Sequence, residues 1–299
     1  MDEPLADPSA VALYFVCNLA SQQLKVVLSG EGADEIFGGY NVYSEPGATF
    51  YDKLPRNLKR AVGSAASKLP AKRGVNFFIR KGKDLEERFI GNAYMFTPEE
   101  RKKLLKIKTE APDPTVITKP FYDKVKKAED VTKMQYLDLH LWMTGDILLK
   151  ADKMSMANSL ELRVPFLDKE IMSVAEKIPV RYRVTHKETT DANTKYITKY
   201  AMRLAVKKDT PPQTAKTAAK KKLGFPVPIR VWLKEDKYYN KVKDSFTSEA
   251  ADKFFNCDLL VKLLDDHRNS KADNSRKIWT IYSFLVWYNV YFGSSEFTK

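Results

Sequence analysis

The segment from Ser29 to Glu35 (Ser-Gly-Glu-Gly-Ala-Asp-Glu) places three carboxylates in and just after a glycine-rich turn. Glycines let the backbone of such a turn approach a phosphate closely, and a helix that begins there directs its N–H groups at the anion. Either Glu31 or Asp34 could hold a Mg²⁺ ion that bridges to the phosphate. The alternative is that these acids only stabilise a helix N-terminus, which favours negative charge. The pattern alone leaves a nucleotide–metal site and simple capping both open.

The flanking residues predict the elements that position this turn. Lys25–Ser29 is a short β-branched run that ends at glycine, which predicts a buried strand. Ala33–Phe37 predicts a helix, and Gly38-Gly39 ends it. Upstream, Asp7-Pro8 is a helix start signal for the apolar run Ala10–Ala20. The expected unit is helix, strand, glycine turn and helix.

The rest of the chain is predicted to be mainly helical. A capping box and a proline after Thr97 open a helix to about Lys106, and Asp168 caps a helix that Pro179 ends. The other predicted helices are Lys133–Leu162 with a break at Gly145, Tyr196–Lys207 and Ser275–Phe292. The proline-rich stretch 111–120 and the lysine-rich stretch 213–222 are predicted to be loops.

Composition places the chain among soluble globular proteins. It has 299 residues, of which 43% are hydrophobic and 30% charged, which is enough for one large domain or two modest ones. The two cysteines, Cys17 and Cys257, are far apart, so neither a disulfide scaffold nor a zinc-ligand spacing is expected. Neither a secretion signal nor a membrane span is recognisable, which predicts a cytoplasmic protein without membrane contact.

The net charge of +13 predicts attraction to polyanions, either nucleic acid or phosphorylated small molecules. The basic residues concentrate in Pro70–Lys83, which has no acidic residue, and in Lys207–Lys222. Neither run carries aromatic residues at the intervals of a base-stacking surface. We therefore interpret both as solvated surface and expect no nucleic acid partner.

Four sequence segments resemble the glutamine-hydrolysing asparagine synthetases of the PP-loop ATP pyrophosphatase superfamily. The run Val26–Tyr40 (VVLSGEGADEIFGGY) resembles a signature of that family, and Lys150–Asp168 (KADKMSMANSLELRVPFLD) resembles another. Lys222–Phe225 matches its lysine-x-glycine-phenylalanine loop, and Glu3–Ser9 is similar to a further stretch. The motifs occur in the family's order over nearly the whole chain.

The resemblance implies an enzyme with two sites. An N-terminal domain releases ammonia from glutamine, and a synthetase domain activates aspartate with Mg-ATP as β-aspartyl-AMP. Ammonia then attacks this intermediate, and asparagine, AMP and pyrophosphate are released. The implied cofactors are ATP and Mg²⁺, and the implied small-molecule substrates are aspartate, ATP and ammonia.

The resemblance also implies roles for individual residues. Ser29 and Gly30 would lie against the nucleotide, and Asp34 would bind the magnesium on pyrophosphate. Glu31 would support adenylate formation and its breakdown by ammonia. Lys222 would neutralise charge that develops between the α- and β-phosphates. These roles agree with the need for cations at a departing pyrophosphate and a carboxylate near the incoming amine.

Two further residues are candidate substrate contacts by the same resemblance. Asp146 corresponds to a carboxylate of the family that faces the aspartate amino group, if a gap is placed nearby when the two sequences are aligned. Tyr40 is a candidate for either substrate contact or core packing, and packing is favoured. Glu161 and Arg163 are expected to be a structural ion pair beside Pro165.

The family's Ser-Gly-Gly-x-Asp-Ser phosphate loop is not found in these 299 residues, nor does a cysteine follow Met1. We therefore expect residues 1–299 to be the C-terminal portion of a synthetase, without its glutaminase domain and inactive alone. By family the fold is α/β with a parallel sheet and helices. Residues 1–50 are expected to be a sheet remnant with an exposed edge that lowers solubility, and residues 51–299 mainly helical. A homo-oligomer is compatible with these features.

Two alternatives stay open at this stage. One is a related amide- or lactam-forming enzyme that adenylates a different carboxylate. The other is a non-catalytic basic protein that binds nucleic acid or another polyanion, which only the net charge supports.

Overall fold

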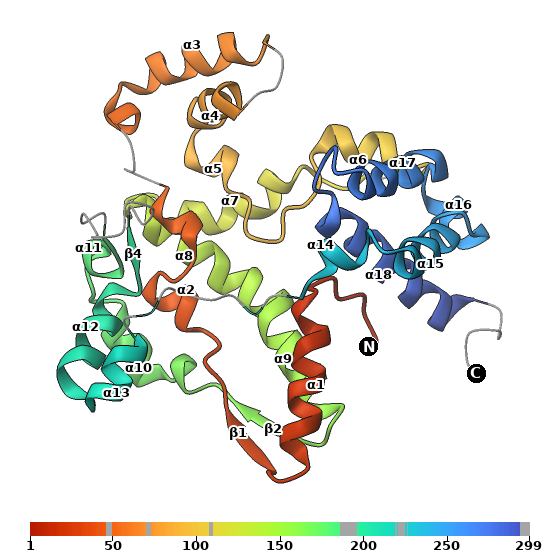
Figure 1. Cartoon of the computed structure of the whole chain (residues 1–299). Coiled ribbons are helices and arrows are strands. Elements are labelled where there is room, and N and C mark those ends of the chain that lie inside the picture. The colour runs from red at the N-terminus through yellow and green to blue at the C-terminus, as the bar shows by residue number, and fades with distance from the viewer. Residues whose placement is uncertain are drawn as a thin grey trace.

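The N-terminal elements position the glycine turn, and they form in the predicted order (Figure 1). Helix α1 (Ser9–Ser21) precedes strand β1 (Val26–Leu28), and the turn leads into helix α2 (Ala33–Phe37). The side chain of Asp7 accepts a hydrogen bond from the Ser9 N–H at 2.9 Å, as a helix start requires. Gly38, at φ 73°, ends α2 in the left-handed conformation that favours glycine. The computed structural model describes residues 1–45, 50–69, 73–107, 110–185, 196–218, 220, 225 and 227–293.

Strand β1 pairs in parallel with β2 (Glu161–Arg163), which lies more than 130 residues further along the chain. The register sets Val26 opposite Glu161 and Leu28 opposite Arg163. The prediction of a buried strand is wrong in one respect, because the Val26 and Leu28 side chains are 42% and 73% exposed. Parallel sheets are normally covered on both faces, and this two-stranded sheet is not.

Most of the described chain is helical, which confirms a mainly helical protein with a small sheet. The further α-helices are α3 (Arg56–Ala66), α4 (Arg73–Lys81), α5 (Leu85–Arg88), α6 (Pro98–Leu104), α7 (Pro114–Lys124), α8 (Asp130–His140), α9 (Leu148–Met156), α10 (Lys169–Ala175), α11 (Val180–Arg183), α12 (Tyr200–Asp209), α13 (Pro212–Ala218), α14 (Ile229–Trp232), α15 (Asp236–Phe246), α16 (Glu249–Phe254), α17 (Cys257–Arg268) and α18 (Ser275–Phe292). The remaining elements are the 3-10 turns η1 (Asn41–Ser44), η2 (Phe50–Lys53) and η4 (Pro165–Leu167), the π-helical turn η3 (Met143–Ile147), and the antiparallel pair β3 (Val184–Thr185) and β4 (Ile197–Thr198).

Several predicted helix boundaries are confirmed by their capping contacts. Thr97 and Glu100 form the predicted capping box at the start of α6. The Asp168 side chain accepts from the Glu170 N–H at 2.8 Å at the start of α10. The predicted break at Gly145 falls within the π-helical turn η3, between α8 and α9. The last helix has the predicted bounds.

Two predicted loops contain helices instead. Helix α7 begins at Pro114, where Asp113 caps the Thr115 N–H at 2.9 Å, and it continues through Pro120. Tertiary contacts outweigh the proline, because the buried Tyr122 in the same helix donates to the Phe89 carbonyl at 2.7 Å. In the lysine-rich stretch, residues 213–218 belong to α13.

Two predicted helices are shorter than expected. The predicted end at Leu162 is wrong, because α9 stops at Met156 and the chain turns through Ser159, at φ 51°, into β2. The predicted start at Tyr196 is four residues early, because β4 pairs with β3 first and α12 begins at Tyr200. In both cases strand pairing overrides local helical periodicity.

Three buried hydrophobic clusters hold the elements together. The largest joins α15, α16, α17 and α18, and the second packs around Met134 and Leu137 of α8. The third buries Ile36 and Phe37 of α2 against Ala175 of α10, which anchors the helix that follows the glycine turn. The helical hairpin α3–α4 projects from the top of the molecule in Figure 1, away from α15–α18.

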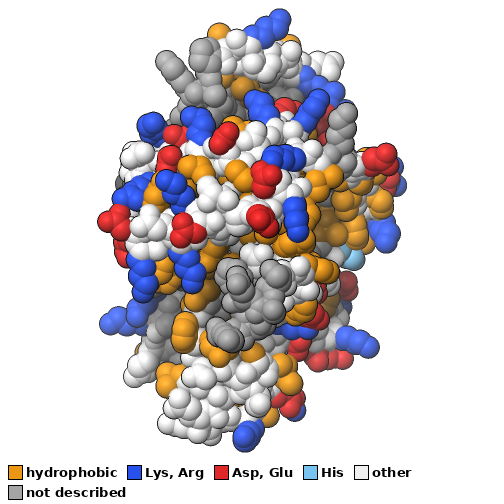
Figure 2. Space-filling model, turned by 90° about the vertical axis from the view of Figure 1, so that its right-hand side faces the viewer, with side chains coloured by type: hydrophobic (Ala, Val, Ile, Leu, Met, Phe, Trp, Pro, Cys, Tyr) orange, Lys and Arg blue, Asp and Glu red, His pale blue; other side chains and the backbone are white. Residues whose placement is uncertain are grey.

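Charges of both signs are interspersed over the face shown in Figure 2, with hydrophobic side chains between them. On this face the net positive charge does not gather into a single patch. Over the described residues, the structure contains no helix with the length and apolar character of a membrane span.

Candidate active site

The glycine turn is fixed to the end of the sheet by backbone geometry. The Ser29 N–H donates to the Arg163 carbonyl at 2.8 Å, so the turn begins where the β1–β2 ladder ends. Gly32 has φ 89°, and a Cβ at this position would lie 2.5 Å from Cδ2 of Leu167. Gly32 is therefore required both for backbone conformation and for the close approach of η4. The predicted arrangement of strand, glycine turn and helix is confirmed.

Asp34 pairs with a lysine that sequence reasoning missed. Asp34 Oδ1 lies 3.1 Å from Nζ of Lys199, the residue just before α12. A Cβ on Gly39 would lie less than 3.0 Å from both the Asp34 carboxylate and the Lys199 side chain. Gly39 therefore leaves the room that this pair occupies. Lys199 stands in no quoted motif, and only the fold brings it to the turn.

Glu31 is half-buried in the turn, and its surroundings favour the protonated form. Burial raises the pKa of Glu31, and the neighbouring Asp34 and Asp7 carboxylates raise it further. The Lys150 ammonium acts in the opposite direction. Lys199 acts in the same direction as Lys150, so residues from three segments distant from the turn, Asp7, Lys150 and Lys199, act electrostatically on Glu31.

Lys150 joins two of the recognised motifs, Glu3–Ser9 and Lys150–Asp168. Its buried ammonium donates to Asp7 Oδ2 at 2.6 Å and to Ser9 Oγ at 2.9 Å. Burial by itself would raise the pKa of Asp7, but the charge and hydrogen bonds of Lys150 and Ser9 bring it below its usual range. The start of α1 is thereby tied to α9.

Asp146 lies beside this ion pair, in the π-helical turn η3. Burial and the Asp7 carboxylate raise the pKa of Asp146 to about 7, although Lys150 partly opposes this. Its Oδ2 atom is buried without a hydrogen-bond partner among the described residues. Such an orphaned acceptor is costly unless a ligand or water satisfies it. The π-turn is a type of distortion often found at functional sites.

Tyr40 and Glu35 lie behind the turn. The Tyr40 hydroxyl donates to Glu35 Oε1 and accepts from Trp142 Nε1 at 3.2 Å. Glu35 is 1% exposed, and burial raises its pKa. Gln135 of α8 donates to the Glu35 carbonyl at 2.6 Å. These contacts fix the orientation of α2.

The other residues singled out in the sequence lie outside the glycine turn itself or outside the described residues. Lys222 lies outside the described residues. Glu161 and Arg163 form the expected ion pair at 2.8 Å, and both side chains are more than half exposed. The cysteines Cys17 and Cys257 are free thiols.

The donors at the turn fit a magnesium ion that arrives with its ligand. The described residues contain no group of three or more side chains that could hold a metal by themselves. Magnesium keeps several waters and is commonly bound by one or two carboxylates together with substrate phosphates. Asp34, with Glu31 beside it, suits that mode, because phosphate oxygens would complete the coordination.

Comparison with known proteins identifies the class to which this fold and turn belong. Residues 1–289 match the sequence model of the asparagine synthase family, and the chain belongs to that family. It is 44% identical over 291 residues to glutamine-hydrolysing asparagine synthetase 1 of Bacillus subtilis, which covers 97% of this chain. It is 41% identical over 293 residues to a protein of Mycobacterium bovis named as a possible glutamine-hydrolysing asparagine synthetase. The chain spans 44% and 43% of the lengths of these two relatives.

Proposed function

We propose that this chain is the synthetase part of a glutamine-hydrolysing asparagine synthetase, a carbon–nitrogen ligase. It would amidate aspartate through β-aspartyl-AMP and release AMP and pyrophosphate. The observation that carries this proposal is the turn from Ser29 to Asp34, which sets a half-buried Glu31 and a lysine-paired Asp34 at the end of a parallel strand. Family membership supports it and does not favour the non-catalytic polyanion binder.

Adenylation requires binding of the triphosphate and stabilisation of the departing pyrophosphate. Ser29 and Gly30 would lie against the nucleotide, since a Cβ at Gly30 would meet nothing within 4 Å and the turn is open there. Asp34 would bind the magnesium that accompanies the phosphates, and when bound that ion neutralises developing charge. Lys199 holds the Asp34 carboxylate in place beforehand. Lys222 would contribute a further positive charge at the pyrophosphate.

Glu31 would act on the incoming nitrogen. Addition of ammonia to the adenylate carbonyl leaves a positively charged nitrogen that must lose a proton before asparagine and AMP separate. A carboxylate whose pKa is raised by burial is a better proton acceptor than a solvated one. The same carboxylate would help to orient the aspartyl group during adenylate formation.

Asp146 would receive the α-amino group of aspartate. Its buried Oδ2 lacks a hydrogen-bond donor, and an ammonium group would supply one. Burial makes the charged form of Asp146 costly, and a bound cation would offset this cost. For Tyr40, a substrate contact stays a prediction, since its hydroxyl is already bonded to Glu35 and Trp142.

We further propose that residues 1–299 work with the part of the relatives' length that they do not match. That part would supply ammonia, the phosphate loop and strands that cover the exposed Val26 and Leu28. The α/β portion would comprise residues 1–50 together with β2, and most of residues 51–299 would form its helical part. A cytoplasmic location and a homo-oligomer belong to the same proposal.

The test is to fuse this chain to the part of the Bacillus subtilis relative that it does not match, giving the joined protein. Pyrophosphate release is measured with Mg-ATP, ammonia and aspartate, for the joined protein and for the 299-residue chain. We expect aspartate-dependent release only from the joined protein. Release that is stimulated by another carboxylate but not by aspartate would favour the related amide- or lactam-forming enzyme. A folded joined protein that binds Mg-ATP but releases no aspartate-dependent pyrophosphate would refute the proposal.

A further inference from the structure

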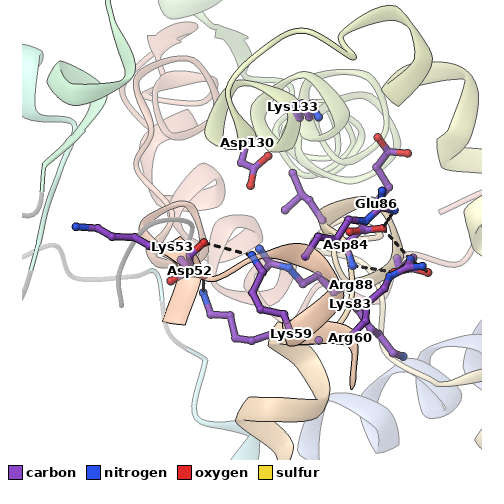
Figure 3. Close-up of a pocket in the computed structure, with 15 residues that line it drawn as sticks. Asp52, Lys53, Lys59, Arg60, Lys83, Asp84, Glu86, Arg88, Asp130 and Lys133 are labelled. Atoms are coloured by element: carbon purple, nitrogen blue, oxygen red, sulfur yellow. Dashed lines mark hydrogen bonds and ion pairs between the residues drawn. The ribbon is translucent and has the colours of Figure 1, made fainter. Parts of the chain in front are cut away.

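A cleft of about 690 Å³ lies between α3, α5 and α8, and no residue of the glycine turn lines it (Figure 3). Its volume falls within the range of small-molecule binding sites. We name it the α3–α8 cleft. Eight basic and five acidic residues line it, so its lining carries an excess of positive charge.

Part of this charge is neutralised by ion pairs in the lining. Arg56 and Arg60 both bind Asp84, the latter at 2.8 Å, and Lys81 binds Asp52 at 2.6 Å. These pairs link α3 to Asp84, which follows the hairpin, and η2 to the end of α4. They stabilise the walls and leave those cations little capacity for a ligand.

Other lysines of the lining lack such partners. Lys59 donates to a backbone carbonyl, that of Asp52, at 3.2 Å. Among the residues that the structure describes, no carboxylate lies within ion-pair distance of Lys83 or Lys133. Figure 3 shows Lys133 and Asp130 on one side of the cleft and Lys59 and Arg60 on the other. Cations without carboxylate partners therefore stand on opposite walls.

The hairpin wall cannot neutralise itself. Residues 56–83 contain nine basic residues and no acidic residue. Helices α3 and α4 meet through backbone, because a Cβ on Gly63 would lie 2.8 Å from Cα of Gly82. This contact fixes the basic wall before any ligand arrives, which lowers the entropic cost of binding.

We propose that the α3–α8 cleft binds a small ligand with two or more phosphate groups, either a free polyphosphate or the phosphate tail of a nucleotide. Lys59, Lys83 and Lys133 supply the positive charges. Ammonium groups bind phosphate as point charges from several directions. Asp130 limits how deeply the anion enters on the α8 side. This site is separate from the adenylation site of the proposed function.

The test uses inorganic triphosphate without magnesium as the probe, with the 299-residue chain. Binding is followed by calorimetry, and its location by amide hydrogen exchange. We expect protection in peptides that cover residues 53–60, 83–88 and 130–133, independent of any change at residues 29–34. Screening should weaken binding as salt is raised. ATP and inorganic triphosphate are compared to separate the two ligand sources.

The key variant is K59E/K133E, which reverses charge on both walls. The loss of two charge-assisted contacts predicts binding at least tenfold weaker. The matched control K102E/K103E makes the same charge change on exposed residues of α6 and should bind within twofold of the unsubstituted chain. Circular dichroism and the melting temperature confirm that both variants fold.

Three results would overturn the proposal. One is a lack of protection in the cleft peptides at millimolar triphosphate. The second is equal binding by K59E/K133E and the control. The third is a single-stranded RNA of about 20 nucleotides that binds more tightly than triphosphate and protects the outer faces of α3 and α4, since this would indicate an extended nucleic-acid surface. Failure of the adenylation assay would leave these measurements unaffected.

Discussion

Substituting Gly39 with alanine should lower activity and leave stability nearly unchanged. The absence of a Cβ at this position makes room for the Asp34–Lys199 pair, whereas the backbone conformation of Gly39 does not require glycine. Gly39 is not among the residues with positive φ, so alanine is compatible with the main chain. Its Cβ would come within 3.0 Å of Asp34 Oδ1 and of the Lys199 side chain. Both side chains are partly exposed and can rotate away, which relieves the clash and separates the pair.

The expected change in the free energy of unfolding is the difference between two contributions, the loss of the ion pair and the reduced freedom of the unfolded chain. A partly exposed ion pair contributes about 0–1 kcal/mol, and the reduced freedom of the unfolded chain returns about 0.4–1 kcal/mol. We therefore expect the melting temperature of Gly39→Ala to shift by no more than about 2 °C. A displacement of Asp34 by about 1 Å should lower pyrophosphate release by about 100-fold.

The assay compares pyrophosphate release by the joined protein with the melting temperature of the 299-residue chain. Gly74→Ala is the matched control, because a Cβ there meets nothing within 4 Å and the residue lies in α4. It should keep full activity and gain up to about 1 kcal/mol from helix propensity. Activity of Gly39→Ala within threefold of the unsubstituted protein would refute the role of Asp34 placement. A large loss of stability would show instead that Gly39 is structural.

The remaining predictions concern single carboxylates and one lysine. Glu31→Gln should leave the melting temperature unchanged and lower pyrophosphate release by the joined protein at least 100-fold, and unchanged asparagine formation would exclude Glu31 from the mechanism. Lys222→Ala should cost roughly 3–4 kcal/mol in the transition state, and turnover within about twofold would contradict this role. Burial raises the pKa of Asp138 to about 7, so the folded state binds more protons than the unfolded state between about pH 4 and pH 7, and stability should fall as pH rises. Asp138→Asn should remove this dependence of the free energy of unfolding on pH, a change of up to about 4 kcal/mol over the interval, when unfolding is measured by urea titration at several pH values. An unchanged pH dependence in Asp138→Asn would assign it to other groups.

The sequence is sufficient to predict those elements whose signals are local. Gly38 ends α2 and Thr97 begins α6 because a left-handed residue and a capping box act within one turn of helix. The glycine turn after β1 is predictable because its signal, a β-branched run that ends at glycine, is also local. The loop prediction around Pro120 is wrong, since the contact of Tyr122 with Phe89 joins segments 33 residues apart and no local pattern reveals it.

Within the candidate site, the same distinction separates Glu31 and Asp34 from Lys199. The two carboxylates were predictable because they stand in one turn whose glycines permit the close backbone approach that a phosphate site needs. Lys199 lies between β4 and α12, and only the tertiary structure, including the pairing of β3 with β4, brings it to Asp34. Lys150 belonged to a recognised segment, yet its contact with Asp7 spans 143 residues.

The long-range contacts also explain why the site depends on the helical part of the chain. Burial raises the pKa of Glu31, Asp34 and Asp7 raise it further, and Lys150 lowers it. Removing Lys150 would leave Asp7 and Asp146 as neighbouring half-buried carboxylates without their cation. One of them would then bind a proton at neutral pH, and the start of α1 would lose its tie to α9. The ion pair that joins α1 to α9 therefore also acts electrostatically on the Glu31 carboxylate, together with burial and Asp34.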